Sequence, residues 1–438
     1  MLKLLLKDKI HFLINKLKLN QFEHLIMHSF WSVFGTLLSR GSMLVSAIIL
    51  ARILNQVEYG QLGILRSTLN FFVVFAGFGL GNTTSKYIAL NKKDNISEAR
   101  RIFDISLIFN FILAIIIALM VFVFAKQITI WSFNDVTLYK QLRVSSFLLF
   151  FATMNGVFTG SLAGFQDFKT IAKNAFYSTC VQSVLSLIGA YYFGVTGSLI
   201  GFGLGYVYLY ILNKRAIDKC FGLQKRMVSF QNYFSEKKSF LWSFSLPAAF
   251  SSFLVTPVFW WAKSFMIRST SFKEMAFFDV ADQWRLVILF VPSALMQIVL
   301  PALTMSNKED FKKTLQFNIK INLFFTLISI VPLILISKYI LSLYGKDYVN
   351  TELFIVLISS ALFSSFCSVI GLAIASKGKM WHGFMFNLFW AVYFIFFTIY
   401  FINNGYGATG LAYAITLSYL LHGTIQFIYF KIKLKREE

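Results

Sequence analysis

Charged side chains are scarce in this chain of 438 residues. They make up 14% of it, against roughly a quarter in an ordinary soluble domain. Hydrophobic residues make up 57%, and the mean hydropathy is +0.67. A soluble fold cannot bury that much apolar surface. The composition therefore excludes an ordinary soluble domain and predicts an integral membrane protein.

Cysteine and several catalytic motifs are also rare or absent. The three cysteines provide no disulfide framework, and the N-terminus lacks the apolar region of a signal peptide. The sequence contains no GxxxxGK[ST] phosphate loop, and its five histidines lack the spacing of metal ligands. We expect no catalytic residue, no metal and no cofactor, and we predict a transporter without an ATPase motif rather than an enzyme.

Long apolar runs are what the chain has in abundance. A helix needs about 20 mostly apolar residues to cross a bilayer. Windows of that length predict an all-α membrane protein with about twelve spans. The spans are expected at 29–51, 61–83, 103–125, 144–165, 171–193, 195–213, 239–265, 276–300, 315–337, 352–375, 381–402 and 407–430.

Basic residues outnumber acidic ones by 41 to 19, which invites a nucleic-acid-binding interpretation. Their positions argue against it. Of the 41, 29 lie in one set of alternate connecting segments and 8 in the other. This asymmetry is typical of the positive-inside rule. We predict that both termini are cytoplasmic and that the partner of this charge is the lipid bilayer, with no nucleic acid involved.

An internal repeat divides the chain. The segments GVTGSLIGFGLGY (194–206) and GATGLAYAITLSY (407–419) align without gaps, and Arg52 and Glu58 match Arg268 and Glu274 in the same order. Small residues recur at spacings of four in the aligned segments, which permits close helix packing in lipid. The packing positions are Gly197, Gly201, Gly205 and Gly410.

The repeat predicts two six-helix lobes of the same orientation, related by an axis along the membrane normal. A cavity between the lobes is the expected place for a substrate. The expected boundaries are a basic amphipathic N-terminus (1–28), an N-terminal lobe (29–213), a basic linker (214–238), a C-terminal lobe (239–430) and a cytoplasmic tail (431–438).

Four basic residues lie inside predicted spans. Arg40 and Arg285 come near mid-membrane, Arg66 lies closer to the outer side, and Lys263 lies at the outer end of its span. A central arginine costs at least ~2.5–3.5 kcal/mol on insertion scales unless it faces protein or water. Each is therefore either a cavity residue or a structural partner of a neighbouring helix, and Lys263 is alternatively a snorkelling residue beside interfacial tryptophans.

Two further groups of residues have two interpretations each. Asp279, Asp282 and Arg285 are spaced i, i+3, i+6, so Asp282 and Arg285 can face one another. The carboxylates are candidates for an ion-coupling site, or they neutralise the arginine. Pro247 and Pro257 in the seventh span are candidate hinges, although kinks are common in membrane helices.

Several segments resemble the polysaccharide flippases of the multidrug/oligosaccharidyl-lipid/polysaccharide exporter (MOP) superfamily. ILARIL and VEYGQLGI (within 49–64) are similar to their first loop, GFGLGNTTSKYIAL (77–90) to the end of their second helix, and GSLAGFQDFKTIAKNAF (160–176) to their fourth-to-fifth loop. YGATGLAYA (406–414) is the main resemblance in the C-terminal half. Residues 55–57, Asn-Gln-Val, depart from the Gly-Pro-Glu-like residues frequent in the family.

The resemblance implies a flippase of the bacterial inner membrane. It would carry polyprenyl-pyrophosphate-linked oligosaccharide repeat units, of the O-antigen or capsule type, and a polysaccharide polymerase is a possible partner. Arginine suits phosphate recognition, because its guanidinium offers a fixed fork of donors. Our hypothesis is that Arg40, Arg285 and Arg66 line the cavity, while Arg52 anchors a loop. A multidrug or cation antiporter, a lipid II flippase and a polysaccharide polymerase or ligase remain alternatives.

Overall fold

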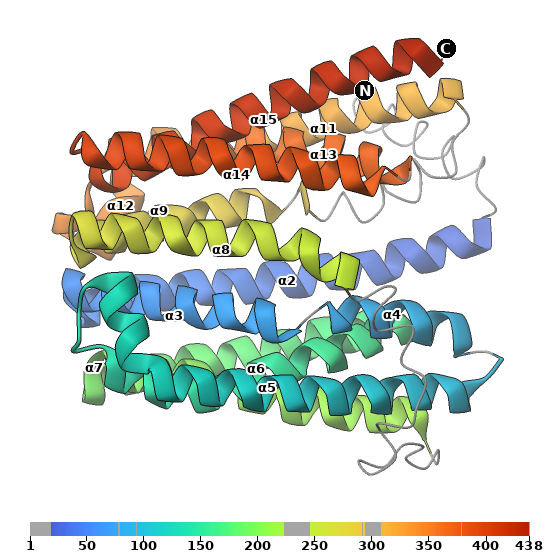
Figure 1. Ribbon diagram of the computed structural model, residues 1–438, viewed down its shortest axis with the longest axis horizontal. Coiled ribbons are helices and arrows are strands. Elements are labelled where there is room, and N and C mark those ends of the chain that lie inside the picture. Colours follow the sequence, from blue (N-terminus) through green and yellow to red (C-terminus); the bar gives the residue numbers. More distant parts are fainter. Residues whose placement is uncertain are drawn as a thin grey trace.

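The computed structural model describes residues 19–77, 79–92, 94–222, 246–290, 292–293, 308–377 and 379–437. These residues form helices and no strand (Figure 1). The helices are α2 (Leu19–Ile53), α3 (Gln56–Gly77), α4 (Leu80–Asn91), α5 (Ile96–Phe133), α6 (Tyr139–Phe165), α7 (Phe168–Phe221), α8 (Leu246–Ser269), α9 (Phe272–Ile288), α11 (Lys308–Leu335), α12 (Ser337–Tyr344), the 3₁₀ turn η3 (Lys346–Tyr348), α13 (Thr351–Ser376), α14 (Met380–Asn403) and α15 (Gly407–Glu437).

The all-helical membrane fold predicted from the sequence is confirmed. Seven described helices are long and apolar enough to cross a bilayer, and an eighth span results if the bent pair α3 and α4 is one span. Every predicted span overlaps a described helix. The count of twelve stays a prediction.

The helix α7 contains two predicted spans, folded as a hairpin. Phe193 and Gly194 break it, and Gly194 has φ of +56°, which a residue without a Cβ adopts at little cost. After this break the second leg returns along the first: Ser186 Oγ donates to the Ser198 carbonyl at 3.0 Å, and Ser178 Oγ to that of Gly205 at 2.8 Å. These bonds satisfy serine hydroxyls that lipid could not satisfy.

The turn between α2 and α3 is fixed by a reciprocal cap. The Asn55 side chain accepts from the Glu58 amide at 2.9 Å, and a Glu58 carboxylate oxygen accepts from the Asn55 amide at 3.2 Å. This is the geometry of a capping box, with asparagine in place of serine or threonine. It explains why a polar segment follows the apolar run that ends at Arg52: the segment starts the next helix.

The helices pack in two groups, the N-terminal helix group (α2–α7) and the C-terminal helix group (α8–α15), which lie one above the other in Figure 1. They meet chiefly through α3 against α8 and α9. A Cβ on Gly60 would collide with the carbonyl of Phe272 and lie 3.3 Å from the Ala276 nitrogen, and one on Gly63 would lie 3.3 Å from Asp279 Cγ.

These contacts join residues that the repeat pairs with one another. At the offset of 216 that matches Arg52 to Arg268, Gly60 corresponds to Ala276 and Gly63 to Asp279. Equivalent residues meet only close to the axis that relates two copies. Gly60 meets Ala276, and three residues later Gly63 meets Asp279, which is also three residues later. The helices α3 and α9 therefore run parallel, as a parallel repeat requires.

Further contacts join the two groups at the end that holds the α2–α3 turn, the α7 turn and α12, on the left of Figure 1. Arg52 Nε donates to the Leu343 carbonyl at 2.7 Å, and Gln56 Nε2 to that of Asp347 at 2.9 Å. Arg268 Nη1 donates to the Trp131 carbonyl at 2.8 Å. The repeat-related Arg52 and Arg268 therefore make reciprocal bonds, each to the opposite group.

Some expected boundaries differ from the structure. The first helix extends back to Leu19, so the segment expected to precede it (1–28) overlaps it, and residues 1–18 lie outside the described part. The last helix of the N-terminal group continues to Phe221 instead of ending at 213, because the polar residues after 213 still fit a helix beyond the apolar core. Pro247, whose side chain is not described, is the second residue of the described part of α8, and Pro257 lies in the interior of this helix.

Candidate functional site

A cavity of about 370 Å³ lies between the two helix groups. α2, α3, α6 and α7 contribute one wall, and α8 and α9 the other. Five of the six charged residues singled out from the sequence line it: Arg40, Arg66, Lys263, Asp279 and Asp282. The two arginines come from the N-terminal helix group and the other three residues from the C-terminal helix group, about 200 residues later in the chain, so only the packing of one group on the other assembles them. We call this space the central cavity.

Arg66, on α3, is held from within the N-terminal helix group. Its Nη2 donates to Ser186 Oγ on α7 at 2.9 Å, and its guanidinium carbon lies 4.6 Å from the centre of the Phe202 ring. Its Nε is buried and has no hydrogen-bond partner among the described residues. An unused donor beside a cavity is energetically unfavourable unless a ligand accepts from it. Arg66 therefore has binding capacity that its neighbours do not use.

Arg40 reaches across to the opposite group. Its Nη1 donates to the Leu286 carbonyl on α9 at 2.7 Å, and its guanidinium lies 5.7 Å from the Phe290 ring. Arg40 is half-buried and makes no ion pair among the described residues. A backbone carbonyl orients the guanidinium without neutralising it, so its charge remains available to the cavity.

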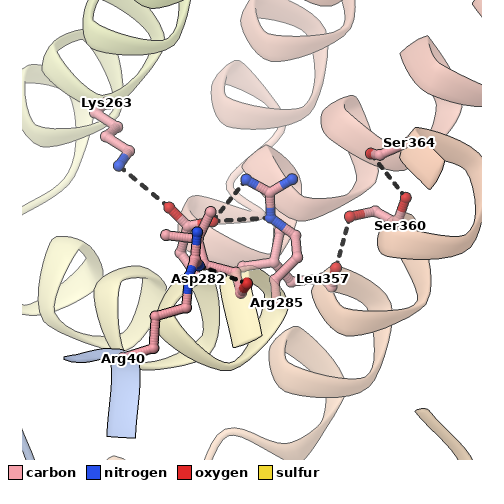
Figure 2. Close-up of polar contacts among 8 residues, drawn as sticks. Arg40, Lys263, Asp282, Arg285, Leu357, Ser360 and Ser364 are labelled. Carbon is pink, nitrogen blue, oxygen red and sulfur yellow. Dashed lines mark hydrogen bonds and ion pairs between the residues drawn. The ribbon is translucent and has the colours of Figure 1, made fainter. Parts of the chain in front are cut away.

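Lys263, Asp282 and Arg285 form a buried triad (Figure 2). Arg285 donates to Asp282 Oδ1 from Nη2 at 2.7 Å and from Nε at 2.8 Å, and Lys263 Nζ lies 3.4 Å from Asp282 Oδ2. One carboxylate thus serves two cations, and the triad keeps a net positive charge. Lys263 points into the central cavity and does not snorkel, because Asp282 holds it there.

Our hypothesis places Arg285 in the same cavity as Arg40, but Arg285 is not among the described residues that line the central cavity. It lines a second cavity of about 400 Å³ within the C-terminal helix group, where serines of α13 and His422 and Gln426 of α15 face it. Arg285 follows Asp282 by three residues, so it leaves α9 in a different direction and lines the second cavity, while its guanidinium still reaches Asp282 (Figure 2). Asp282 and Arg285 together form the wall between the two cavities.

A polar chain along α3 and α9 was not found from the sequence. Gln283 Nε2 donates to Asp279 Oδ2 at 3.0 Å and to the Tyr59 hydroxyl at 2.9 Å. The rings of Tyr59 and Tyr348 are 6.1 Å apart, edge to face. Burial, and next the nearby Asp279, raise the pKa of Tyr348, which lies between spans, so its hydroxyl stays protonated at neutral pH. The i, i+4 spacing of Asp279 and Gln283 is the one sequence signal for this chain.

One of the two tryptophans expected at the membrane interface, Trp260, lies between the helix groups instead. Trp260 stacks on Phe71 with ring centres 4.4 Å apart, and its Nε1 donates to Thr68 Oγ1 at 3.0 Å. Trp261 stacks on Phe265. A hydrogen-bond acceptor on α3 explains why the Trp260 indole turns inward rather than toward the headgroups.

The charge of the central cavity decides what it can hold. Its described lining includes three cations and two carboxylates, and both carboxylates accept hydrogen bonds from neighbouring side chains. Free donor capacity lies on Arg40 and Arg66. Among the described residues, no three His, Cys, Asp or Glu side chains gather as metal ligands would. The arrangement suits an anionic ligand with several acceptor oxygens.

The class of protein follows from comparison of the fold. The inward-facing conformation of a multidrug resistance MATE family transporter of the MOP superfamily matches with a TM-score of 0.73 and 16% identity, over 92% of this chain and 95% of that one. A second match is a MOP superfamily transporter from Pyrococcus furiosus, with a TM-score of 0.69 and 15% identity over 94% of this chain and 95% of that one. That transporter is described as having a binding pocket of reverse polarity that suggests a different function. The protein thus has the fold of a multi-pass MOP transporter.

The family follows from the sequence itself. A family model described as "Polysaccharide biosynthesis protein" matches residues 25–307, which is more than half of the chain, so the chain belongs to this family. The EPS I polysaccharide export inner membrane protein EpsE of Ralstonia nicotianae is 24% identical over 186 residues. That match spans 40% of this chain and 42% of the relative's length. The family resemblance predicted from the sequence is confirmed.

Proposed function

We propose that the protein is a flippase for polyprenyl-pyrophosphate-linked oligosaccharides, of the O-antigen or capsule type, in the bacterial inner membrane. The observation that carries this proposal is the central cavity, where Arg40, Arg66 and Lys263 from both helix groups surround one space between two lobes. Family membership and the export relative support a glycan as cargo.

The physical problem of the reaction is the pyrophosphate. Carrying a doubly charged group through hydrocarbon uncovered is prohibitive, because an isolated buried charge costs many kcal/mol. Fixed guanidinium groups replace its water, and the polyprenyl tail stays in the bilayer beside the protein. In this proposal Arg66 and Arg40 bind the phosphate oxygens, and Lys263 approaches the ligand as Asp282 is drawn toward Arg285.

The motion we propose is alternating access between two lobes, 29–213 and 239–430, related by duplication. The bonds of Arg52, Gln56 and Arg268 join the two groups at the end that faces outward in this proposal, which supports a closed outer end in this state. Both termini lie on the cytoplasmic side, as the distribution of Lys and Arg favours. Pro257 inside α8 is a candidate hinge.

A multidrug or cation antiporter is the main rival, since it shares the fold. Organic cations require a carboxylate that is available to them, and here Asp279 and Asp282 are both engaged. A polymerase of the same pathway is a partner in this proposal, not the activity of this chain.

The experiment follows lipid-linked oligosaccharides in cells with and without the protein. A membrane-impermeant glycan-modifying enzyme is applied to spheroplasts. We expect complete repeat units to stay protected only when the protein is missing. If repeat units reach the outer face even without the protein, but long polysaccharide chains fail to form, the protein acts in polymerisation instead. If Arg40→Ala and Arg40→Lys both leave export unchanged, Arg40 has no role in the cavity.

A further inference from the structure

A groove of about 590 Å³ lies at the end of the α7 hairpin that is opposite to its turn. Every described lining residue comes from α7 or is Asp167, directly before it. No described residue of α2 or α6, the two helices that pack most extensively against α7, lines the groove, and its side chains Lys173, Tyr177, Arg215 and Lys219 are exposed. The groove therefore opens between the two legs on the side that faces away from the rest of the helix bundle, where lipid surrounds a membrane protein. We call it the hairpin groove.

The helix rise places the hairpin groove at the depth of the lipid headgroups. Lys173 precedes Phe193 by twenty residues, and Arg215 follows Gly194 by twenty-one. At 1.5 Å per residue both lie about 30 Å from the turn, which is the thickness of the hydrocarbon core. At the turn, Tyr191, Tyr192 and Phe193 are all exposed, as in an aromatic belt at the opposite interface.

The charge of the hairpin groove is strongly positive. Lys173, Arg215 and Lys219 line it and are exposed, and Asp167 is the one acidic residue in the described part of its lining. A carboxylate oxygen of Asp167 already accepts from the Thr170 amide at 3.1 Å as the N-cap of α7. None of the three cations has an ion pair within the described part of the chain. Three like charges on two adjacent legs repel one another unless an anion lies between them.

The remaining lining suits a lipid rather than a free ion. Tyr177 and Tyr208 lie one to two turns deeper in the membrane than Lys173 and Arg215, and Lys173 Nζ lies 5.8 Å from the centre of the Tyr177 ring. Leu212 and Ala216 continue the same surface. Cations at headgroup depth with aromatic and aliphatic side chains beneath them form the profile of a phospholipid, with its phosphate above its acyl chains.

We propose that the hairpin groove binds an anionic phospholipid of the bilayer, whose phosphate bridges Lys173 on the first leg to Arg215 and Lys219 on the second. Basic pockets between membrane helices on the cytoplasmic side bind anionic headgroups in this way. The site is separate from the central cavity and does not depend on the proposed cargo. Its occupant stabilises the hairpin by neutralising the repulsion between its legs.

The test is native mass spectrometry of the purified full chain with added phosphatidylglycerol or phosphatidylcholine. We expect retained phosphatidylglycerol adducts and at least tenfold weaker retention of phosphatidylcholine. The variant Lys173→Gln/Arg215→Gln/Lys219→Gln is expected to lose the phosphatidylglycerol preference. The matched control Lys126→Gln/Lys140→Gln/Lys338→Gln removes the same charge from exposed residues at the opposite end and should retain it.

Two measurements make the result decisive. Thermal unfolding in detergent checks that the triple variant folds, and added phosphatidylglycerol should raise the melting temperature of the wild type and the control but not of the triple variant. Excess inorganic phosphate should not displace the lipid. Equal phosphatidylglycerol retention by the triple and control variants would overturn the proposal, and displacement by inorganic phosphate would assign the groove to free anions instead.

Discussion

At the scale of single residues, Arg66 gives the most direct support for the proposed binding of a pyrophosphate. It is anchored by Ser186 and by the Phe202 ring, and its Nε has no partner among the described residues. An arginine fixed in this way is pre-organised for phosphate oxygens, because little side-chain freedom is lost when it binds.

We predict that Arg66→Gln lowers export by about 10- to 100-fold, since a hydrogen bond to a charged group contributes about 1.5–3 kcal/mol. Arg66→Lys should keep part of the activity, because it keeps the charge but loses the fork of donors. The measurement is outer-leaflet repeat units per unit of protein in membranes. Arg143→Gln is the control, since Arg143 lies outside the cavity and donates to the Phe122 carbonyl of its own helix group. Full export by Arg66→Gln would remove Arg66 from the site.

The pair of Asp282 and Arg285 gives a prediction about stability. Removing one partner of a buried ion pair costs about 3–5 kcal/mol, because the other charge stays buried without compensation. Asp282→Asn should lower the melting temperature in detergent strongly, because Arg285 and Lys263 both lose their counter-charge. Arg285→Gln should lower it less, because Lys263 still pairs with Asp282, and the double variant should lose less than the sum of the two single losses. Glu98→Gln, in an exposed pair with Arg101, is the control and should change the free energy of unfolding by less than about 1 kcal/mol. Additive losses in the double variant would show that the pair is not coupled.

The sequence could predict which charged residues lie inside the spans, but not toward which side of a helix each side chain points. Depth alone placed Arg40 and Arg285 at the same level, and the i, i+3 spacing predicted that Asp282 and Arg285 face one another. The cavity that Arg285 lines depends on how α9 packs against α13 and α15, and that is a property of the packed helices. The inward turn of Trp260 depends in the same way on Thr68 of a distant helix.

At the scale of elements, the α7 hairpin shows how glycine spacing becomes close packing. A Cβ on Gly197 would collide with the Gly189 backbone, one on Gly201 with the Leu185 backbone, and one on Gly205 would lie 2.5 Å from Gln182 Cβ. The spacing of four that the sequence shows at these positions is therefore the contact face of the second leg. Gly410 occupies the corresponding place in α15, against Phe401 and Tyr406.

We predict that Gly201→Val destabilises the protein by at least about 1–3 kcal/mol, because a side chain there forces the two legs apart. The measurement is the melting temperature and the yield of folded protein after detergent extraction. Gly371→Ala in α13 is the matched control, since a Cβ there meets no atom within 4 Å. A Gly201→Val variant as stable as this control would mean that the legs are not closely packed in the membrane.

The turns between helices could be predicted in part from the sequence. The glycines at 194 and 407 align in the repeat, and both have positive φ, +56° and +50°. In the C-terminal helix group, Glu274 Oε2 accepts from the Ala408 amide at 2.6 Å. In the N-terminal helix group, Glu58 lies close to Gly194. The aligned glutamates thus lie beside the aligned turns, a relation that the sequence alone could not give because it holds between distant segments.

At the scale of the whole molecule, the two groups are closed against one another at one end by repeat-related arginines. Arg52 and Arg268 each donate to a carbonyl of the opposite group. The sequence suggested that Arg52 anchors a loop, but it could not show that the anchor crosses between the groups. In the proposed alternating access, these bonds must break for this end of the interface to open.

We predict that Arg52→Ala/Arg268→Ala shifts the protein toward the outward-open state by about tenfold, which corresponds to about 1.4 kcal/mol. The measurement is labelling of a Ser67→Cys reporter in the central cavity by a membrane-impermeant thiol reagent from outside, in a cysteine-free background. Arg143→Ala is the control, because its bond stays within one helix group. Unchanged labelling in the double variant would show that these bonds do not hold the outer end closed.

The central claim is that this cavity moves a lipid-linked pyrophosphate glycan across the bilayer. The measurement that tests it most directly uses vesicles reconstituted with the purified protein and a polyprenyl-pyrophosphate-linked oligosaccharide carrying a fluorophore. A membrane-impermeant reductant then bleaches the outer leaflet. We predict that the wild type exposes the inner-leaflet fraction, while Arg66→Gln protects it almost as protein-free vesicles do. A protected inner fraction with the folded wild type, or equal exposure with Arg66→Gln, would contradict the account.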